Sequence, residues 1–188
     1  MEIFSRVEEV VREACLNSTF YSISSWIHCR RVAEISRELA AKNKGDQMVA
    51  YAAGLLHDLG SVRYGRENHH WTGAKDSVSL LKSLGFSPSF IAKVAHCVYA
   101  HRGSVNCRRK SREAIWVAAA DAIDHFDKVD ELIAVTQRDL SLEEPEARVF
   151  LAEKFERDWK KIPEEAKPLV KKQYRQALLA IRKPRLFP

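Results

Sequence analysis

Histidine and aspartate side chains are concentrated in one stretch of the chain, GLLHDLGSVRYGRENHHWTGA, which spans residues 54–74. His57 and Asp58 end an apolar run, and His69 and His70 follow a polar loop. Neutral imidazole nitrogens and carboxylate oxygens are suitable ligands for Mn, Fe, Ni, Co and Zn ions. The stretch therefore predicts a site for a divalent metal ion, whose identity the ligand types leave open.

Further side chains of the same kind lie in apolar surroundings elsewhere in the chain: His28, His96, His101 and Asp121. Asp121 follows the run IWVAAA, which has the composition of a buried helix, and a buried carboxylate needs a cation or hydrogen-bond donors. Neighbouring residues on a helix point about 100° apart, so His57 and Asp58 can face different sides of a cleft. Taken singly, each residue is more often a hydrogen-bonded core residue than a ligand, so the prediction rests on the set.

The size and charge of the chain set the classes of ligand that it favours. The chain has 188 residues, 46% hydrophobic and 30% charged, which is enough for a sizeable core. Its formal net charge of +6 at pH 7 favours anions, including phosphorylated compounds and nucleic acid. Much of this excess lies in residues 108–112 and in a basic C-terminal end, residues 167–185.

Cysteine usage and hydropathy predict a protein of the reducing cytoplasm with no membrane partner. The four cysteines, at positions 15, 29, 97 and 107, show no paired spacing of the kind that zinc ribbons or disulfide frameworks use. The first residues, MEIFSRVEEVVREAC, carry acidic side chains and form an amphipathic helical pattern instead of a signal peptide. No apolar run approaches the roughly 20 residues of a membrane span.

Hydrophobic periodicity predicts an all-α protein. No segment alternates with period two, and only 7 Gly and 6 Pro interrupt the helical pattern. Helices are expected over residues 2–16, 24–43, 47–57, 70–84, 88–101 and 112–126, followed by a charged helix after 141 and a basic helix ending near 182. Residues 59–69 are expected to form a loop because they contain Gly60 and Gly65. Ser141 and Glu144 fit a capping box for the charged helix.

The chain shows no internal repeat and no low-complexity linker, so we expect a single all-α domain over residues 1–188. Its core would be a helical bundle over residues 20–130, and residues 131–188 would form a C-terminal helical extension. A homodimer through this amphipathic extension stays open.

Four segments of the chain resemble the HD-domain superfamily of metal-dependent phosphohydrolases. They are WIHCRRVAEISRELA, AYAAGLLHDLGS, ENHHWTGAKDSVSLLKSLGFSPSFIAKVAHCVYAHRGS and SREAIWVAAADAIDHFDKV, and together they cover about residues 20 to 130. The superfamily is all-α. The resemblance implies a first metal ion held by His28, His57, Asp58 and Asp121.

The resemblance extends to two-metal members of the superfamily. HHWTGA is similar to their H-x-x-x-G-A element, which selects His69 over His70 as a ligand, and VYAHRGS selects His101 in the same way. His96 stands five residues before His101, about 140° round a regular helix, so it would serve as a ligand or a substrate contact from another face. The resemblance thus implies one or two divalent ions per chain.

The chain also departs from the commonest pattern of the superfamily. Many relatives carry Lys or Arg directly after the His-Asp-hydrophobic-Gly run, where this chain has Ser61. A positive group for a phosphate must then come from elsewhere, and the candidates are Arg31, Arg63, Arg66 and Arg102. We favour Arg102, which follows His101 directly, and we assign catalytic roles to Asp58 and Arg102. The absence of an HHE…GYP element disfavours the cyclic-di-GMP branch.

The resemblance implies that water activated by the metal cleaves a phosphoester or phosphoanhydride of a nucleotide or another small phosphorylated compound. A di-iron oxygenase is an alternative, because the same ligands would serve it. A non-catalytic nucleotide or nucleic-acid binding module is another. Nucleic acid is the less favoured partner, because no basic stretch is interleaved with aromatic residues that could stack on bases.

Overall fold

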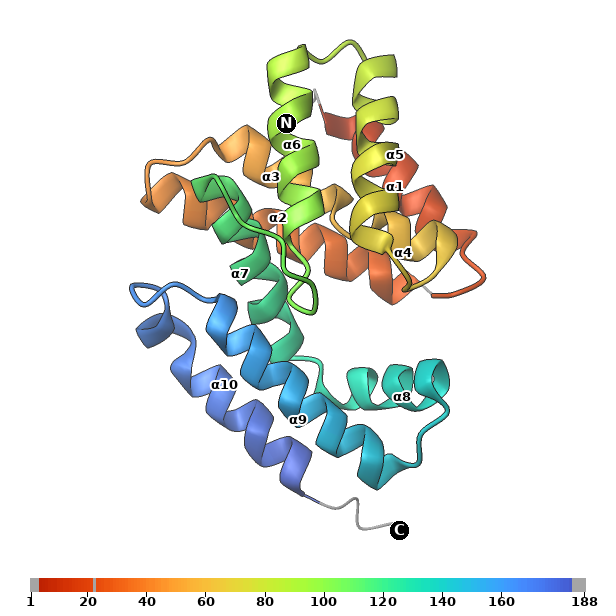
Figure 1. The fold of residues 1–188 in the computed structure, drawn as a ribbon, viewed down its shortest axis with the longest axis vertical. Helices are drawn as coiled ribbons and strands as arrows, with labels where there is room; N and C mark the ends of the chain where they lie inside the picture. The colour runs from red at the N-terminus through yellow and green to blue at the C-terminus, as the bar shows by residue number, and fades with distance from the viewer. Residues whose placement is uncertain (1–3, 22, 184–188) are drawn as a thin grey trace. The chain divides into compact units, whose positions relative to one another are not determined.

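The chain folds into helices joined by short loops (Figure 1). A computed structural model describes residues 4–21 and 23–183, and these residues form ten helices and no strand. The expectation of an all-α protein is therefore confirmed. The chain divides into two units, Met1–Asp121 and Ala122–Pro188. This division falls earlier than residue 130, where the core was expected to end.

The first unit contains α1 (Ser5–Leu16), α2 (Ile23–Lys42), α3 (Gln47–Leu56), α4 (Leu59–Tyr64), α5 (His69–Ser83), α6 (Pro88–Ala100) and most of α7 (Arg112–Phe126). The helices expected in this part of the chain are all present, and the ends of α2, α3, α5, α6 and α7 differ from expectation by no more than one residue. The predicted start of the first helix, at residue 2, lies outside the described residues.

Local capping explains why the boundaries of α3 and α6 could be predicted. The side chain of Asp46 accepts hydrogen bonds from the backbone N–H groups of Met48 and Val49, at 3.1 and 3.2 Å. The hydroxyl of Ser87 accepts one from the N–H of Phe90, at 3.3 Å, directly before a first-turn proline. Both residues satisfy N–H groups that a helix start leaves without partners, so they fix where the two helices begin.

Close contact between α2 and α3 brings two of the predicted ligands together. All residues of α3 from Val49 to Leu56 are buried, and α3 lies against both α2 and α6. A Cβ added at Gly54 would lie only 2.5 Å from the Cα of Ala33 on α2. Glycine is therefore required where the two backbones meet. This approach holds the helix that carries His28 beside the helix that ends at His57.

The expectation of a loop over residues 59–69 is wrong for its first half, which forms the short helix α4. Gly60 has the appearance of a helix breaker in the sequence, but its role is to allow close packing between α4 and α5. A Cβ at this position would lie 2.4 Å from the carbonyl oxygen of His69 and 2.5 Å from the backbone nitrogen of Gly73. Only residues 65–68 connect the two helices.

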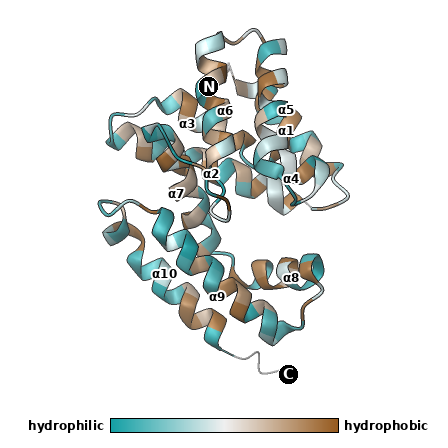
Figure 2. Cartoon of the chain, in the orientation of Figure 1, coloured by the Kyte–Doolittle hydropathy of each residue, from teal (hydrophilic) through white to brown (hydrophobic). Residues whose placement is uncertain are grey.

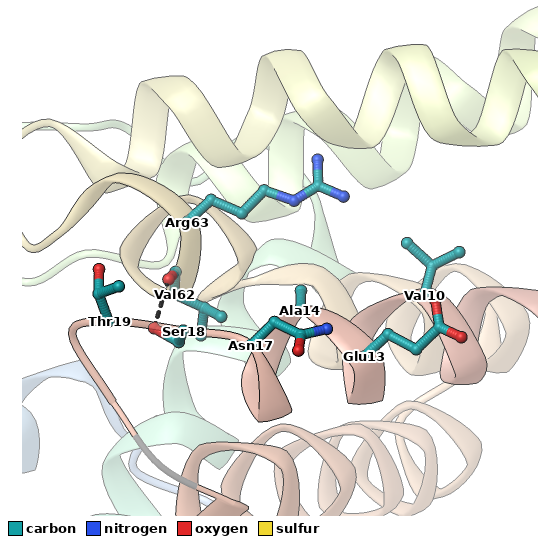
Figure 3. Close-up of a pocket in the computed structure, with 8 residues that line it drawn as sticks. All are labelled: Val10, Glu13, Ala14, Asn17, Ser18, Thr19, Val62 and Arg63. Carbon is teal, nitrogen blue, oxygen red and sulfur yellow. Dashed lines mark hydrogen bonds between the residues drawn. The ribbon is translucent and has the colours of Figure 1, made fainter.

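A cavity of about 420 Å³ opens between the end of α1 and α4 (Figure 3). Its lining includes Glu13, Asn17 and Thr19, and the hydroxyl of Ser18 donates a 2.6 Å hydrogen bond to the carbonyl oxygen of Val62 across it. None of its lining residues is a predicted metal ligand.

The second unit contains α8 (Val129–Leu140), α9 (Glu144–Lys161), α10 (Lys167–Arg182) and the end of α7. Hydrophilic and hydrophobic residues alternate along α9 and α10, as expected for helices with one buried face (Figure 2). Aromatic rings join the helices: Phe126 meets Phe155 edge to face at 5.2 Å, and Trp159 stacks on Tyr174 at 4.4 Å between centroids. Residues 184 and 185 of the basic C-terminal end lie outside the described residues.

Two features of the second unit differ from expectation. Helix α8 was not predicted, although Val129, Ile133 and Thr136 are buried at helical spacing. The capping box was placed on the wrong residues, because α9 is capped by Glu143 and not by Ser141. The backbone N–H of Glu143 donates to the side chain of Glu146 at 3.2 Å, whereas Ser141 ends α8 in a left-handed conformation with φ of 53°.

Two global properties complete the description of the fold. None of the described helices combines the length and the apolar character that a membrane span needs. All four cysteines carry free thiols, and those of Cys15, Cys29 and Cys97 are buried.

A buried carboxylate in the second unit, that of Asp158, gathers several charged side chains. Asp158, with 3% of its surface exposed, lies 2.6 Å from the ammonium group of Lys154 and 2.9 Å from that of Lys161. Nδ1 of His125 lies 3.2 Å from the same carboxylate. A buried ion that loses its counter-ion leaves uncompensated charge, which is strongly destabilising.

We expect Asp158→Ala to lower the free energy of unfolding by about 3–5 kcal/mol, because two lysines would lose their buried partner. Urea denaturation measures the difference. The matched control is Glu153→Ala on the same helix, since Glu153 is exposed and its ion pair with Arg157 is long, at 3.9 Å. The control should lower the free energy of unfolding by less than about 1 kcal/mol. Equal costs for the two variants would contradict the role given to Asp158.

The same carboxyl makes stability depend on pH. Burial by itself raises the pKa of Asp158, but Lys154 and Lys161 outweigh it and lower the pKa well below its usual range. A depressed folded-state pKa contributes stability above the unfolded value of about 3.9, and this contribution is lost as the pH falls further. The difference in urea midpoint between wild type and Asp158→Ala should therefore shrink below about pH 4. A difference that stays constant to pH 2.5 would contradict this.

Candidate metal centre

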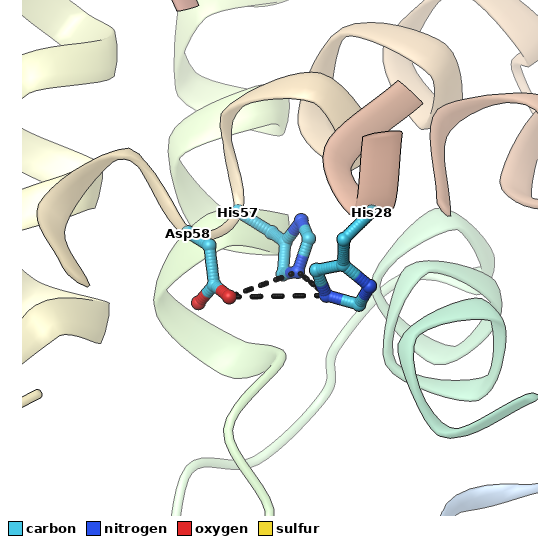
Figure 4. Close-up of side chains that lie close together, drawn as sticks. All are labelled: His28, His57 and Asp58. Atoms are coloured by element: carbon cyan, nitrogen blue, oxygen red, sulfur yellow. Dashed lines mark hydrogen bonds and ion pairs between the residues drawn. The ribbon is translucent and has the colours of Figure 1, made fainter. Parts of the chain in front are cut away.

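The first group of ligands comes from α2, the end of α3 and the start of α4 and meets at one point (Figure 4). Nε2 of His28 lies 3.1 Å from Nε2 of His57. Oδ2 of Asp58 lies 3.8 Å from the first nitrogen and 3.6 Å from the second. The three ligand atoms lie within 4.8 Å of one another, close enough to hold one metal ion.

Asp121 joins this first group from α7. Its Oδ1 lies 3.5 Å from Nε2 of His28 and 3.8 Å from Nε2 of His57. Only 5% of its surface is exposed. The structure therefore places the two carboxylates of Asp58 and Asp121 on the same pair of imidazoles.

A second group forms around the other oxygen of Asp58. Oδ1 lies 3.6 Å from Nε2 of His69, at the start of α5, and 3.8 Å from Nε2 of His101, at the end of α6. The two nitrogens are 3.2 Å apart. Each oxygen of Asp58 thus faces a different pair of histidines, which is the arrangement of a carboxylate that bridges two ions.

Backbone carbonyls set the orientation of three of the rings. Nδ1 of His57 donates to the carbonyl of Gly54 at 2.7 Å, and Nδ1 of His101 donates to that of Val98 at 2.6 Å. Nδ1 of His69 donates to the carbonyl of Arg66 at 2.8 Å. A carbonyl only accepts, so the proton is assigned to Nδ1 and the lone pair to Nε2. Such partners fix the tautomer of metal-binding histidines.

The resulting tautomers make the second group electrostatically incomplete without a cation. The Nε2 atoms of His69 and His101 both carry lone pairs and face each other at 3.2 Å. Two neutral rings in this state have no proton to share, so they repel unless a positive ion lies between them. The donor set therefore fits a divalent ion that accepts imidazole nitrogen and carboxylate oxygen.

Burial favours the neutral form of two of these imidazoles, His57 and His101. It lowers the pKa of His101 to about 3, assisted by the neighbouring His57 and His69. It also lowers the pKa of His57, against the opposite effect of Asp58. Burial alone would raise the pKa of Asp58, but the surrounding imidazoles outweigh it and lower the pKa. A metal ion binds the carboxyl group in its ionised form and the imidazole in its neutral form.

His96 was predicted as a ligand from sequence, and the structure does not bring it to either group. Its Nε2 accepts a 3.0 Å hydrogen bond from the backbone N–H of Lys110, so it ties the loop after α6 to that helix. His96 faces away because it stands on another side of α6 from His101. We leave it out of the proposed ligand set.

His70 is buried beside the second group without belonging to it. Its ring lies 5.2 Å from that of Tyr99, and its Nδ1 has no hydrogen-bond partner among the described residues. Burial lowers its pKa, and the charge of Arg102 adds to this effect. The choice of His69 over His70 as the candidate ligand agrees with this placement.

The four candidate arginines are sorted by their contacts. Arg63 is engaged elsewhere, because its guanidinium pairs with Asp76 at 2.7 Å on the side of α4 that faces α5. Arg31 is exposed on α2. Arg102 interacts electrostatically with the candidate ligand Asp58 and with Arg66.

The sequence analysis did not predict the carbonyl groups that orient the histidine rings, although their spacing from the histidines could have indicated them. Each of the three orienting carbonyls belongs to the residue three positions before its histidine. A histidine at or next to a helix end can reach a carbonyl one turn back, so this spacing follows from placing His57 and His101 at the ends of α3 and α6.

Comparison with known families agrees with this geometry. The HD domain profile matches residues 25–125, more than half of the chain and a range that includes all six clustered ligands. This chain belongs to the HD domain family. The resemblance inferred from the sequence is thereby confirmed, and the family supports a metal-dependent hydrolase with a divalent metal site.

Individual relatives add detail to the family assignment. The chain is 36% identical over 106 residues to ribonuclease Y of Desulforudis audaxviator, a match that covers 56% of this chain and 19% of that protein. A predicted HD superfamily hydrolase from an uncultured Thermotogales bacterium is similar over 95% of this chain and 90% of its own, with 26% identity and a TM-score of 0.59. Bacillus subtilis YpgQ in complex with ADP shares the fold over 96% of this chain and 92% of its own, with 17% identity and a TM-score of 0.71.

We expect wild-type protein to bind about two metal ions per chain, one for each histidine group, and Asp58→Asn to retain well below one. The variant removes an oxygen ligand from both groups, and even the loss of an outer partner typically costs roughly 10–100-fold in metal affinity. Elemental analysis after incubation with Mn, Fe, Ni, Co or Zn measures the content.

The control for this measurement is Asp76→Asn, because Asp76 pairs with Arg63 and none of the clustered ligand atoms belongs to it. It should keep the wild-type metal content. Equal content in the two variants, or no uptake of any of the five metals by wild type, would contradict the assignment of the ligands.

Proposed function

We propose that the HD family domain of this chain hydrolyses a phosphoester or phosphoanhydride bond in a nucleotide or another small phosphorylated compound. The observation that carries the proposal is the placement of Asp58, whose two oxygens face two separate pairs of histidine nitrogens. Bound there, a pair of divalent ions would activate water and offset the negative charge that develops on phosphorus. His28, His57 and Asp121 would hold one ion, His69 and His101 the other, and Asp58 both.

Arg102 would bind the phosphate. Its Nε donates to the hydroxyl of Ser104 at 2.7 Å, which holds the side chain in place. Burial lowers the pKa of Arg102, and Arg66 lowers it further, while Asp58 opposes both effects. Two arginines close to each other are stabilised by an anion between them, and a guanidinium matches phosphate oxygens in geometry.

Two relatives support different classes of phosphorylated substrate. YpgQ, which shares the fold, forms a complex with ADP, and this favours a nucleotide. The similarity to ribonuclease Y makes an RNA phosphodiester the second candidate, although the shared part is about a fifth of that protein. The net charge of +6 favours either anion.

The proposal predicts metal-dependent release of phosphate, pyrophosphate or nucleotide when wild-type protein is screened against nucleotides and short RNA. Asp58→Asn should lower kcat/KM at least about a hundredfold, because several kcal/mol of charge stabilisation are lost with the ions. Arg102→Gln should raise KM roughly tenfold or more, which is the usual effect of losing a charged hydrogen bond. Arg63→Gln, whose side chain is engaged by Asp76, is the matched control and should change neither constant.

Other outcomes would replace the proposal. Oxygen consumption by an iron-loaded protein, without phosphate release, would favour a di-iron oxygenase. Salt-sensitive binding of RNA without turnover of any substrate would favour a binding module.

A further inference from the structure

The net positive charge of the chain is concentrated on α10 and the residue that follows it. Residues 167–183 contain no aspartate or glutamate but six basic residues, Lys167, Lys171, Lys172, Arg175, Arg182 and Lys183. The chain has 31 basic residues in all, so the other 25 are equal in number to its 25 acidic residues. The formal net charge of +6 is therefore the charge of this one segment, and the rest of the chain is balanced.

One side of α10 is used for packing within the second unit. Val170, Ala177 and Ile181 are buried, and at 100° per residue they lie within about 40° of one another around the helix. The ring of Tyr174 stacks on that of Trp159 on α9, with centroids 4.4 Å apart. These contacts fix the rotation of α10 about its own axis, and so they also fix which of its residues meet solvent.

Five of the six basic residues are exposed, and we call them the basic face of α10: Lys171, Lys172, Arg175, Arg182 and Lys183. None of them forms an ion pair with a carboxylate among the residues that the structure describes. Lys167 differs, because it is only partly exposed and pairs with Glu164. The charge of the basic face is thus not neutralised within the described part of the chain.

The basic face forms a row and not a pocket. Lys171, Arg175 and Arg182 stand at positions i, i+4 and i+11, which a helix places within about 40° of one another. At 1.5 Å per residue this row extends about 16 Å along the helix, with Lys172 and Lys183 beside it. Charges spread over this length do not converge on a single small anion. They match a polymer that carries negative charge at regular intervals.

A membrane surface fits α10 less well than a nucleic acid does. A helix that binds a membrane surface inserts its apolar face between the lipids. The apolar face of α10 is buried by packing, and its exposed leucines, Leu169 and Leu179, stand ten residues apart. The aromatic residue of α10, Tyr174, is engaged with Trp159, so the basic face offers no free ring on which a base could stack. Contact with nucleic acid would therefore be made by charge alone.

We propose that the basic face of α10 binds the phosphodiester backbone of a nucleic acid, without regard to base sequence. Lysine and arginine side chains that neutralise phosphates release condensed counterions, so the affinity falls as the salt concentration rises. Contacts to phosphates carry no sequence information directly. The surface belongs to the second unit and includes no candidate metal ligand, so this inference does not rest on the proposed function.

The test measures fluorescence anisotropy of labelled oligouridylate and oligothymidylate of equal length with the full chain in EDTA. The triple variant Lys171→Gln, Arg175→Gln and Arg182→Gln should weaken the binding of both at least about tenfold at about 0.1 M salt. It should also lower the slope of log Kd against log salt by about 2, because each phosphate contact on a single strand contributes about 0.7.

The matched control removes the same charge from exposed positions on α1, α2 and α5 of the first unit, with Arg12→Gln, Lys42→Gln and Lys82→Gln. It should keep both dissociation constants within about threefold of wild type, since long-range charge alone has a smaller effect than direct contact. Glutamine is a good helix former, so both triple variants should keep the circular dichroism and the urea midpoint of wild type.

Several results would overturn the inference. Equal losses in the two triple variants would show that only the total charge matters. Tighter binding to vesicles of phosphatidylserine and phosphatidylcholine would assign α10 to a membrane surface, and equal affinity for polyglutamate would assign it to acidic proteins. Binding that needs Mn and disappears in EDTA would place the nucleic acid at the metal centre. Absence of metal uptake would remove the proposed function and leave this inference intact.

Discussion

The centre depends on imidazole lone pairs that are forced to face one another. Backbone carbonyls take the Nδ1 protons of His57, His69 and His101, and the unprotonated Nε2 atoms point inward. Between His69 and His101 this leaves two lone pairs 3.2 Å apart, an arrangement that a bound metal ion would stabilise. Because a neutral ring is needed for this, burial that lowers the pKa of His57 and His101 serves the same end.

The packing of the first unit serves to hold these rings in place. His57, His69 and His101 stand at helix starts or ends and His28 lies within α2, so their positions depend on how closely the helices approach. Gly54 lets α3 touch α2 near His28, and Gly60 lets α4 touch α5 at the carbonyl of His69. In both places a side chain would meet backbone atoms at about 2.5 Å or less, so glycine controls ligand geometry without being a ligand. The charged cluster at Asp158 stabilises the second unit in a different way, through buried ion pairs.

The loop between α6 and α7 brings positive charge to the first unit. Arg102 lies in the loop that His96 attaches to α6, and its guanidinium interacts electrostatically with Asp58. His96 is informative here, because a histidine expected to bind metal instead anchors the loop that carries Arg102. The formal net charge of +6 of the whole chain favours anionic ligands.

The sequence by itself determined the helical class and most helix ends, because these depend on local patterns. Asp46 and Ser87, for example, cap their helices by accepting hydrogen bonds from N–H groups only two or three residues away. The residues that the structure gathers at the candidate metal centre were implied by the resemblance to the HD-domain superfamily. Tertiary structure alone decided the features that arise between distant segments. The sequence predicts Gly60 as a loop residue, and only the structure shows that it packs against the backbone of His69. Likewise, the sequence does not show that Arg63 pairs with Asp76 whereas Arg102 interacts with Asp58.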